Sequence, residues 1–131
     1  MKRILVIDDD IMTLEVIRKI LEAEGYQVIT ALNGQKGLEA FRQNPVDLVI
    51  TDLVMPVKDG LRTIMELREE DQLLPIIAIS AGGAIAKERY LTAAQYLGDI
   101  TAIPKPLKRK EIVQTVKKLL RQQDPSDALE I

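Results

Sequence analysis

The sequence has 131 residues, a length that suits one domain with a buried core and no need of disulfides or structural metal. Hydrophobic residues make up 47% of it, aromatic residues only 3%, and the net charge is −2, so we expect an aliphatic core and see no electrostatic support for nucleic-acid binding. The absence of Cys and His excludes disulfides, thiolate and imidazole metal ligands, and His-based acid–base chemistry. Carboxylates, hydroxyls, Lys and Arg remain for chemistry.

Short apolar runs bounded by Gly, Pro or polar residues recur through the chain and predict five β-strands. They are Ile4–Ile7, Tyr26–Thr30, Val46–Thr51, Pro75–Ile79 and Ile100–Ile103. The first run is too short for a signal peptide or a membrane span, so we expect a cytoplasmic protein with no membrane partner.

Apolar residues at helical spacing fill the intervals between the strands and predict five helices. In chain order, the first ends at Gly25, the second stops at Asn44-Pro45, the third follows Gly60, the fourth covers roughly Ala86–Leu97, and the last carries Ile112, Val116, Leu119 and Leu120. This alternation predicts an α/β fold, a doubly wound five-stranded parallel sheet with helices on both faces. We expect one domain over residues 1–123 and a disordered tail over residues 124–131.

Four of the predicted strands lead into residues able to do chemistry. The first strand ends in Asp8 and Asp9, the third in Asp52 and the fourth in Ser80, and Lys105 lies just past the end of the fifth. In a parallel sheet these strand ends share the edge where ligands bind. Crowded carboxylates raise one another's pKa unless a cation neutralises them, and Mg²⁺ prefers oxygen ligands. The cluster therefore indicates phosphoryl transfer, with Asp52 as the candidate nucleophile that forms an aspartyl phosphate.

Each of these residues also has a plain structural interpretation when taken alone. Ser80 could be a turn residue, Lys105 a solvated lysine and Asp52 the start of an Asx-turn. Asp10 is expected to be only the N-cap of the first helix. The occurrence of chemical groups at successive strand ends favours the functional interpretation. The methionines are expected to serve packing alone: Met12, Met55 and Met65.

Four segments of the chain, in this order and at these spacings, resemble the response-regulator receiver domain of two-component signalling, in the CheY-like superfamily. They are Ile7–Asp10, Thr51–Pro56 with Asp59-Gly60, Ile79–Ala81 and Lys105-Pro106. The resemblance covers about residues 3 to 121 and implies a flavodoxin-like receiver fold with strand order 2-1-3-4-5.

The resemblance also implies a phosphoryl acceptor and a metal site. Asp52 would accept a phosphoryl group from a phosphohistidine on a histidine kinase or a histidine phosphotransfer protein. Asp9 and Asp52 would ligate Mg²⁺ directly and Asp8 through a water molecule. The backbone carbonyl of Val54 would complete the protein's share of the ligands.

For the signal itself, the resemblance implies that Lys105 holds one phosphate oxygen and that Ser80 bonds another and shifts its loop. The family also tends to have a cis peptide at the position of Lys105-Pro106. One departure concerns the position three places before the conserved lysine, where the family commonly has an aromatic residue and this chain has Ala102. We therefore expect the signal to leave by a route other than Ser/Thr-aromatic coupling, to a downstream protein target.

Three functions stay open at this point. The first is a phosphorylatable switch with no separate substrate turnover, and hence not an enzyme, in which phosphorylation could also drive a homodimer. The second is a receiver-fold interaction module that binds its partner constitutively, which Ala102 favours and the intact acidic cluster opposes. The third is a small Mg²⁺-dependent phosphatase, suggested by the spacing of Asp8 and Asp10. Direct binding to nucleic acid is not expected.

Overall fold

The structure is a computed structural model that describes residues 1–53, 60–80 and 100–122. Within these ranges the chain forms five strands and four helices. The elements are β1 (Arg3–Ile7), α1 (Ile11–Ala23), β2 (Gln27–Ala31), α2 (Gly34–Gln43), β3 (Leu48–Asp52), α3 (Gly60–Glu70), β4 (Ile76–Ser80), β5 (Thr101–Pro104) and α5 (Arg109–Gln122). The helix expected over residues 86–97 and the tail expected over residues 124–131 lie outside the described residues.

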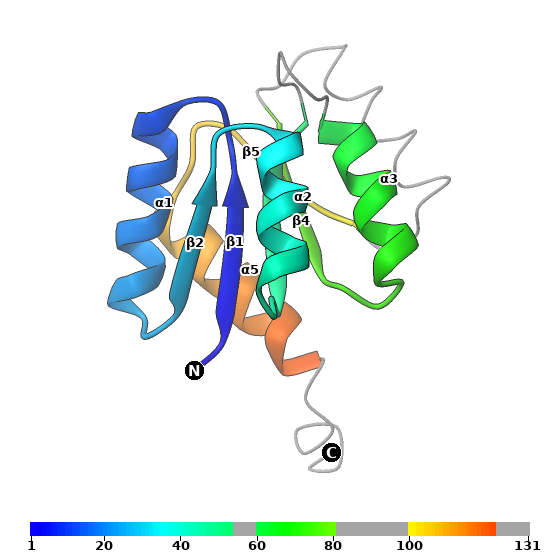
Figure 1. Cartoon of the computed structure of the whole chain (residues 1–131). Helices are drawn as coiled ribbons and strands as arrows, with labels where there is room; N and C mark the ends of the chain where they lie inside the picture. The colour runs from blue at the N-terminus through cyan, green and yellow to red at the C-terminus, as the bar shows by residue number, and fades with distance from the viewer. Residues whose placement is uncertain (54–59, 81–99, 123–131) are drawn as a thin grey trace.

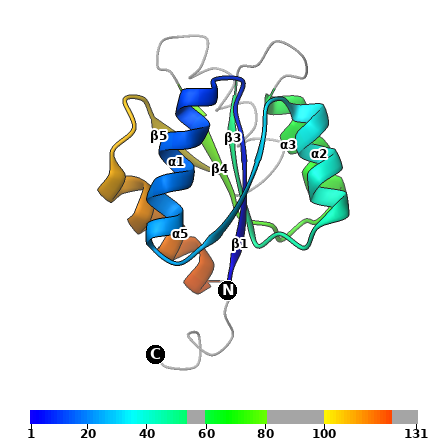
Figure 2. The same ribbon diagram turned by 60° about the vertical axis from the view of Figure 1, so that its left-hand side comes forward.

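The five strands make one parallel sheet in the order β2-β1-β3-β4-β5 (Figure 1), which confirms the expected strand order. Helices α1 and α5 cover one face of this sheet, and α2 and α3 cover the other (Figure 2). The doubly wound arrangement is therefore confirmed, with four of the five expected helices inside the described part of the chain.

The central strands are buried on both faces, as expected for continuous apolar runs in a parallel sheet. Every residue of β3 is buried, and the four residues Ile4–Ile7 of β1 have no exposed surface. Alternate side chains enter two aliphatic clusters: Leu5 and Ile7 pack under α2 and α3, whereas Ile4 and Val6 pack under α1 and α5. None of the described helices has the length and apolar character needed to cross a membrane.

The ends of α1 follow their sequence signals. Asp10 is the N-cap, and its side chain accepts a hydrogen bond from the backbone N–H of Met12. Gly25 follows the helix with a φ of 92°, a left-handed conformation that glycine adopts without strain.

The packing role expected for the methionines is wrong for two of them, since Met12 is 77% exposed and Met65 is 47% exposed. Met55 lies outside the described residues.

Candidate functional site

The acidic cluster lies where β1 and β3, neighbours at the centre of the sheet, end. The register pairs Ile7 with Thr51, so the residues that follow in each strand emerge side by side. Asp8 and Asp9 come directly after β1, and Asp52 is the last residue of β3. Carboxylate oxygens of these three residues lie within 4.8 Å of one another. The topology thus brings together the three acids that the sequence predicted as neighbours.

Asp8 is the most constrained of the three acids. Its side chain is fully buried, and its Oδ1 accepts a 2.9 Å hydrogen bond from the backbone N–H of Asp10. Its Oδ2 is buried with no hydrogen-bond partner in the described structure. Burial, reinforced by the nearby charge of Asp52, raises the pKa of Asp8 to about 6, although the Asp10 N–H acts in the opposite direction. A buried carboxylate oxygen without a partner, close to two further acids, fits a site for a hard cation.

Asp10 belongs to the helix rather than to this cluster. Its carboxylate accepts hydrogen bonds from the hydroxyl of Thr13 and the backbone N–H of Met12, and these bonds hold its pKa below the ordinary value. This geometry confirms its interpretation as an N-cap.

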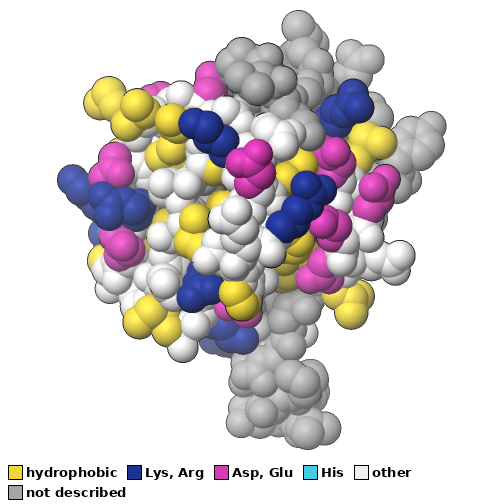
Figure 3. Space-filling view, in the orientation of Figure 1, with side chains coloured by type: hydrophobic (Ala, Val, Ile, Leu, Met, Phe, Trp, Pro, Cys, Tyr) yellow, Lys and Arg dark blue, Asp and Glu magenta, His cyan; other side chains and the backbone are white. Residues whose placement is uncertain are grey.

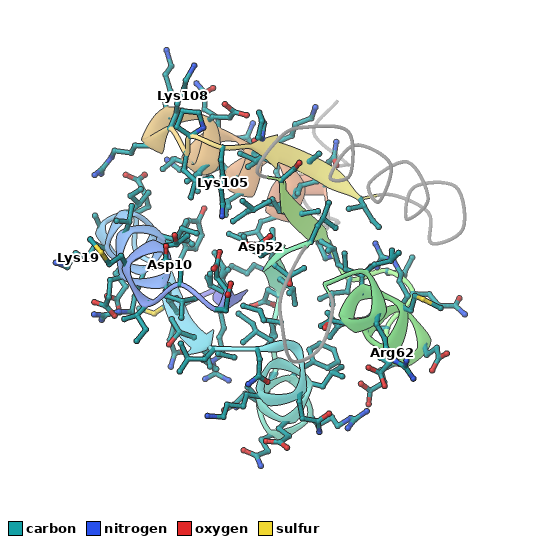
Figure 4. All side chains as sticks on the ribbon, turned by 90° about the horizontal axis from the view of Figure 1, so that it is seen from above. Asp10, Lys19, Asp52, Arg62, Lys105 and Lys108 are labelled. Atoms are coloured by element: carbon teal, nitrogen blue, oxygen red, sulfur yellow. The ribbon has the colours of Figure 1, made fainter. Side chains whose placement is uncertain are left out.

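Lys105 supplies the positive charge beside the acids. Its Nζ lies 3.3 Å from Oδ2 of Asp52, with which it forms an ion pair (Figure 4). Strands β4 and β5 bring it there, because its backbone N–H donates a 2.7 Å hydrogen bond to the carbonyl of Ser80. The peptide bond between Lys105 and Pro106 is cis, which confirms the expectation from the family resemblance.

Ser80 ends β4 half-buried, in register with Pro104 of β5. It therefore lies one strand away from Asp52, at the same edge of the sheet. Ala102, at the position where an aromatic residue was expected by resemblance, is half-buried in β5 and pairs with Ala78. Val54, expected to offer a backbone carbonyl to the metal, lies outside the described residues.

Two residues support the end of β3 through contacts that were not expected from the sequence. The hydroxyl of Thr51 is buried and donates a 3.1 Å hydrogen bond to the carbonyl oxygen of Asp52. Gly60 begins α3, and its N–H donates to the carbonyl of Leu53 at 3.1 Å. A Cβ atom at Gly60 would lie 1.9 Å from the carbonyl oxygen of Asp52, so only glycine lets α3 approach this closely. The available signals were a lone polar residue in an apolar run and a glycine at a helix start.

The arrangement combines an acceptor carboxylate, acids that can hold a cation, and a lysine. The Asp52 side chain is 10% exposed and forms an ion pair with Lys105. Oxygen ligands and a point positive charge are the groups that stabilise a phosphoryl group in transfer. The geometry is compatible with phosphorylation of Asp52.

Comparison with known proteins identifies relatives of the whole described fold. The sequence model of the response regulator receiver domain matches residues 4–117. The transcriptional regulatory protein CpxR of Klebsiella pneumoniae is 34% identical over 121 residues, which are 92% of this chain and 50% of CpxR. The chemotaxis protein CheY of Treponema pallidum is 37% identical over 122 residues, which are 91% of this chain and 83% of CheY.

Among solved structures, the response regulator TrrA of Thermotoga maritima, in complex with Mg²⁺ and BeF, matches with a TM-score of 0.80 and 34% identity. The match covers 91% of this chain and 99% of that one. By contrast, the chain spans about half the length of CpxR and of the Mycobacterium leprae response regulator MprA. The similarity therefore concerns one domain of those longer proteins.

Proposed function

The chain belongs to the response regulator receiver domain family, and on this basis we propose that it is a phosphorylation-dependent switch of a two-component phosphorelay. Asp52 accepts a phosphoryl group from a phosphohistidine of a histidine kinase or a histidine phosphotransfer protein. A carboxylate oxygen forms a bond to phosphorus while the bond between phosphorus and the imidazole nitrogen breaks. The domain comprises residues 1–123 and passes its signal to a downstream protein.

The observation that carries this proposal is the position of Asp52 between two acids and a lysine. Asp8, Asp9 and Asp52 have carboxylate oxygens within 4.8 Å of one another, and Lys105 Nζ lies 3.3 Å from Oδ2 of Asp52. A solvated surface acid would not be surrounded in this way at the end of a fully buried strand. The surroundings suit a carboxylate that gains and loses a doubly charged group.

The residues divide the work by position. Lys105 holds an oxygen of the phosphoryl group, and Ser80, at the end of the adjacent strand, bonds another. Asp9 and Asp52 would hold Mg²⁺ directly and Asp8 would hold it through a water molecule, and the carbonyl of Val54, outside the described residues, would be a further ligand. When bound, Mg²⁺ supplies positive charge that neutralises the phosphoryl oxygens.

The product of this chemistry is a modified protein rather than a released compound. We therefore infer a signalling role without turnover of a separate substrate. Some relatives are longer and are named as transcriptional regulators. Their further partners and any action on DNA are not assigned to this chain.

The test is intact-protein mass spectrometry after incubation with acetyl phosphate and Mg²⁺, with Asp52→Asn as the matched variant. We expect the wild type to gain one phosphoryl group of about 80 Da, and we expect no gain in the variant or when a chelator removes Mg²⁺. Lys105→Gln should react more slowly while keeping its fold.

Two outcomes would contradict the proposal. If Asp52→Asn gained the same mass as the wild type, the acceptor would be another residue. If the wild type gained nothing from acetyl phosphate or from a phosphohistidine protein, the constitutive interaction module would become the better explanation.

A further inference from the structure

The charges of this chain are distributed unevenly. Residues 108–121 contain six of its 18 Lys and Arg residues and only one of its 20 Asp and Glu residues. On the face drawn in Figure 3, by contrast, basic side chains lie next to acidic ones. The overall charge of −2 therefore conceals one strongly basic helix, α5.

The basic side chains of α5 are aligned on its outer side. Ile112, Val116 and Leu120 face the sheet and are buried. At about 100° per residue, the opposite side presents a row within a sector roughly 80° wide and about 16 Å long. We call this row the basic stripe; its members, all exposed, are Lys110, Gln114, Lys118 and Arg121.

Two basic residues beside the stripe, Lys117 and Arg109, have a role in the stability of the fold that the stripe residues lack. Lys117 and Arg109 pair with Glu24 at the end of α1, at 2.9 and 3.6 Å respectively. These contacts fix α5 against α1.

The three basic residues of the stripe form no ion pair with any other described residue. Lys118 and Arg121 lie three residues apart, where like charges repel, although both favour the negative end of the helix dipole. Lys110 lies at the positive end of the dipole, where a basic residue is unfavourable. Lys108, which points away from the acidic cluster in Figure 4, adds a further positive charge at this end. The helix dipole thus favours two residues of the stripe, but neither the dipole nor an ion pair within the described residues accounts for Lys110 or for the row as a whole.

We propose that the basic stripe of α5 binds an acidic segment of a partner protein, one with carboxylates three and four residues apart along a helix. Charge complementarity selects this class of partner, and a straight row on a rigid helix fits another helix better than an irregular loop.

Other polyanions fit the stripe less well. All exposed residues of α5 are polar, so it lacks the apolar side chains that a membrane-surface helix inserts. It has no aromatic residue on which single-stranded nucleic acid could stack. The net charge of −2 gives no electrostatic support for binding of the chain to a DNA duplex. The proposal does not depend on phosphorylation of Asp52.

The experiment measures fluorescence anisotropy of a labelled peptide of about four helical turns with Glu residues three and four apart on one face. The control peptide is nearly isosteric and uncharged on this face, because it has Gln in place of each Glu. The stripe variant is Lys110→Gln/Lys118→Gln/Arg121→Gln. The matched variant, Lys19→Gln/Lys36→Gln/Arg62→Gln, removes the same charge from exposed residues of α1, α2 and α3; Lys19 and Arg62 are shown in Figure 4.

We expect the Glu peptide to bind the wild type, and the stripe variant to lose at least about tenfold in affinity. The matched variant and Asp52→Asn should keep wild-type affinity, and the Gln peptide should not bind. Equal losses in the stripe and matched variants would overturn the proposal, because attraction would then follow net charge alone. Absence of binding by the wild type, or tighter binding of a DNA duplex or an anionic vesicle through the same residues, would also overturn it.

Discussion

At the amino edge of the sheet, Arg3 satisfies polar groups from several segments, whereas at the carboxyl edge the buried Asp8 keeps one carboxylate oxygen without a partner in the described structure. The Arg3 N–H donates to Oδ2 of Asp47 at 2.8 Å, and its guanidinium donates to the side chain of Gln27 and the carbonyl of Pro45. The same sheet therefore has one edge built for stability and one where acids are crowded at a cost in stability.

This difference between the two edges indicates which residues of the fold are placed for function rather than for stability. Buried polar groups are normally paired, so an unpaired one needs a reason other than folding. At the carboxyl edge the proposed function supplies that reason, since the acids there would receive a cation and a phosphoryl group. Substitutions at the two edges should consequently affect stability and phosphorylation in different ways.

The largest effect is expected from Gly60→Ala, which would break the carboxyl edge. The added Cβ would lie 1.9 Å from the Asp52 carbonyl oxygen and 2.7 Å from Cα of Leu53, and both are backbone atoms that cannot move aside. We expect the free energy of unfolding, measured in urea, to fall by about 3 kcal/mol or more. Gly25→Ala is the control: it adds no close contact but retains a φ of 92°, and should cost about 1 kcal/mol. Equal losses for the two would show that α3 can shift away.

Asp8→Asn is expected to stabilise the protein at pH 7 in the absence of Mg²⁺. The pKa of Asp8 is about 6 in the folded state and near 3.8 otherwise, so the native state holds the proton more tightly than the unfolded state does. This contribution to stability is present below pH 3.8 and is lost as the pH rises through 6. At neutral pH the amide should therefore add about 2 kcal/mol to the free energy of unfolding.

Mg²⁺ should reverse that advantage. Added Mg²⁺ should raise the melting temperature of the wild type more than that of Asp8→Asn, because a cation compensates the crowded carboxylates. A variant that is no more stable than the wild type at pH 7, or that responds equally to Mg²⁺, would contradict the view that this edge is electrostatically strained.

A smaller effect is expected where α2 approaches β1. A Cβ at Gly37 would lie 2.4 Å from Cδ1 and 2.8 Å from Cγ1 of Ile7, which directly precedes Asp8. Gly37→Ala should lower the free energy of unfolding by about 1–2 kcal/mol, after the gain in helix propensity. Ile7→Val removes the closer atom, so a double-mutant cycle should show favourable coupling of about 1 kcal/mol. Additive effects would mean that the two positions do not share this space.

The smallest effect belongs to the amino edge. Asp47→Ala removes the acceptor of the Arg3 N–H and should cost about 0.5–1 kcal/mol in urea unfolding. Its rate of phosphorylation by acetyl phosphate should equal that of the wild type, because Asp47 lies at the opposite end of the sheet from Asp52. A slower rate in a variant that is still folded would show that the two edges are coupled.

All five strands could be predicted from the apolar runs, but most of their boundaries could not. The third and fourth strands end in Asp52 and Ser80, as expected, but they begin at Leu48 and Ile76, later than the apolar runs that start at Val46 and Pro75. The hydrophobic pattern ends one residue before the strand does, because the ladder continues through backbone pairs such as Asp52 with Ile79. Asp52 and Ser80 are therefore held by the sheet itself rather than by the loops.

The site could be predicted in its members but not in its contacts. Strand order and parallel direction are enough to bring Asp8, Asp9, Asp52 and Lys105 to one edge. The closeness of α3 to β3 depends on tertiary packing, so the sequence placed Gly60 before the third helix but did not reveal its contact with Asp52. The exposure of the Met12 side chain could likewise not be predicted from the sequence, because an apolar residue in the first turn of a helix need not face the sheet.

The position of β1 between β2 and β3 has a consequence for how the chain folds. Ile4 pairs with Val28, 24 residues further along, and with Leu48, 44 residues further along. Closing the shorter segment costs less chain entropy, so β1, α1 and β2 should associate first, and β3 should complete the other side of β1 before β4 and β5 add in turn. Truncations such as Leu5→Ala should slow refolding, whereas truncations such as Ile103→Ala should mainly speed unfolding.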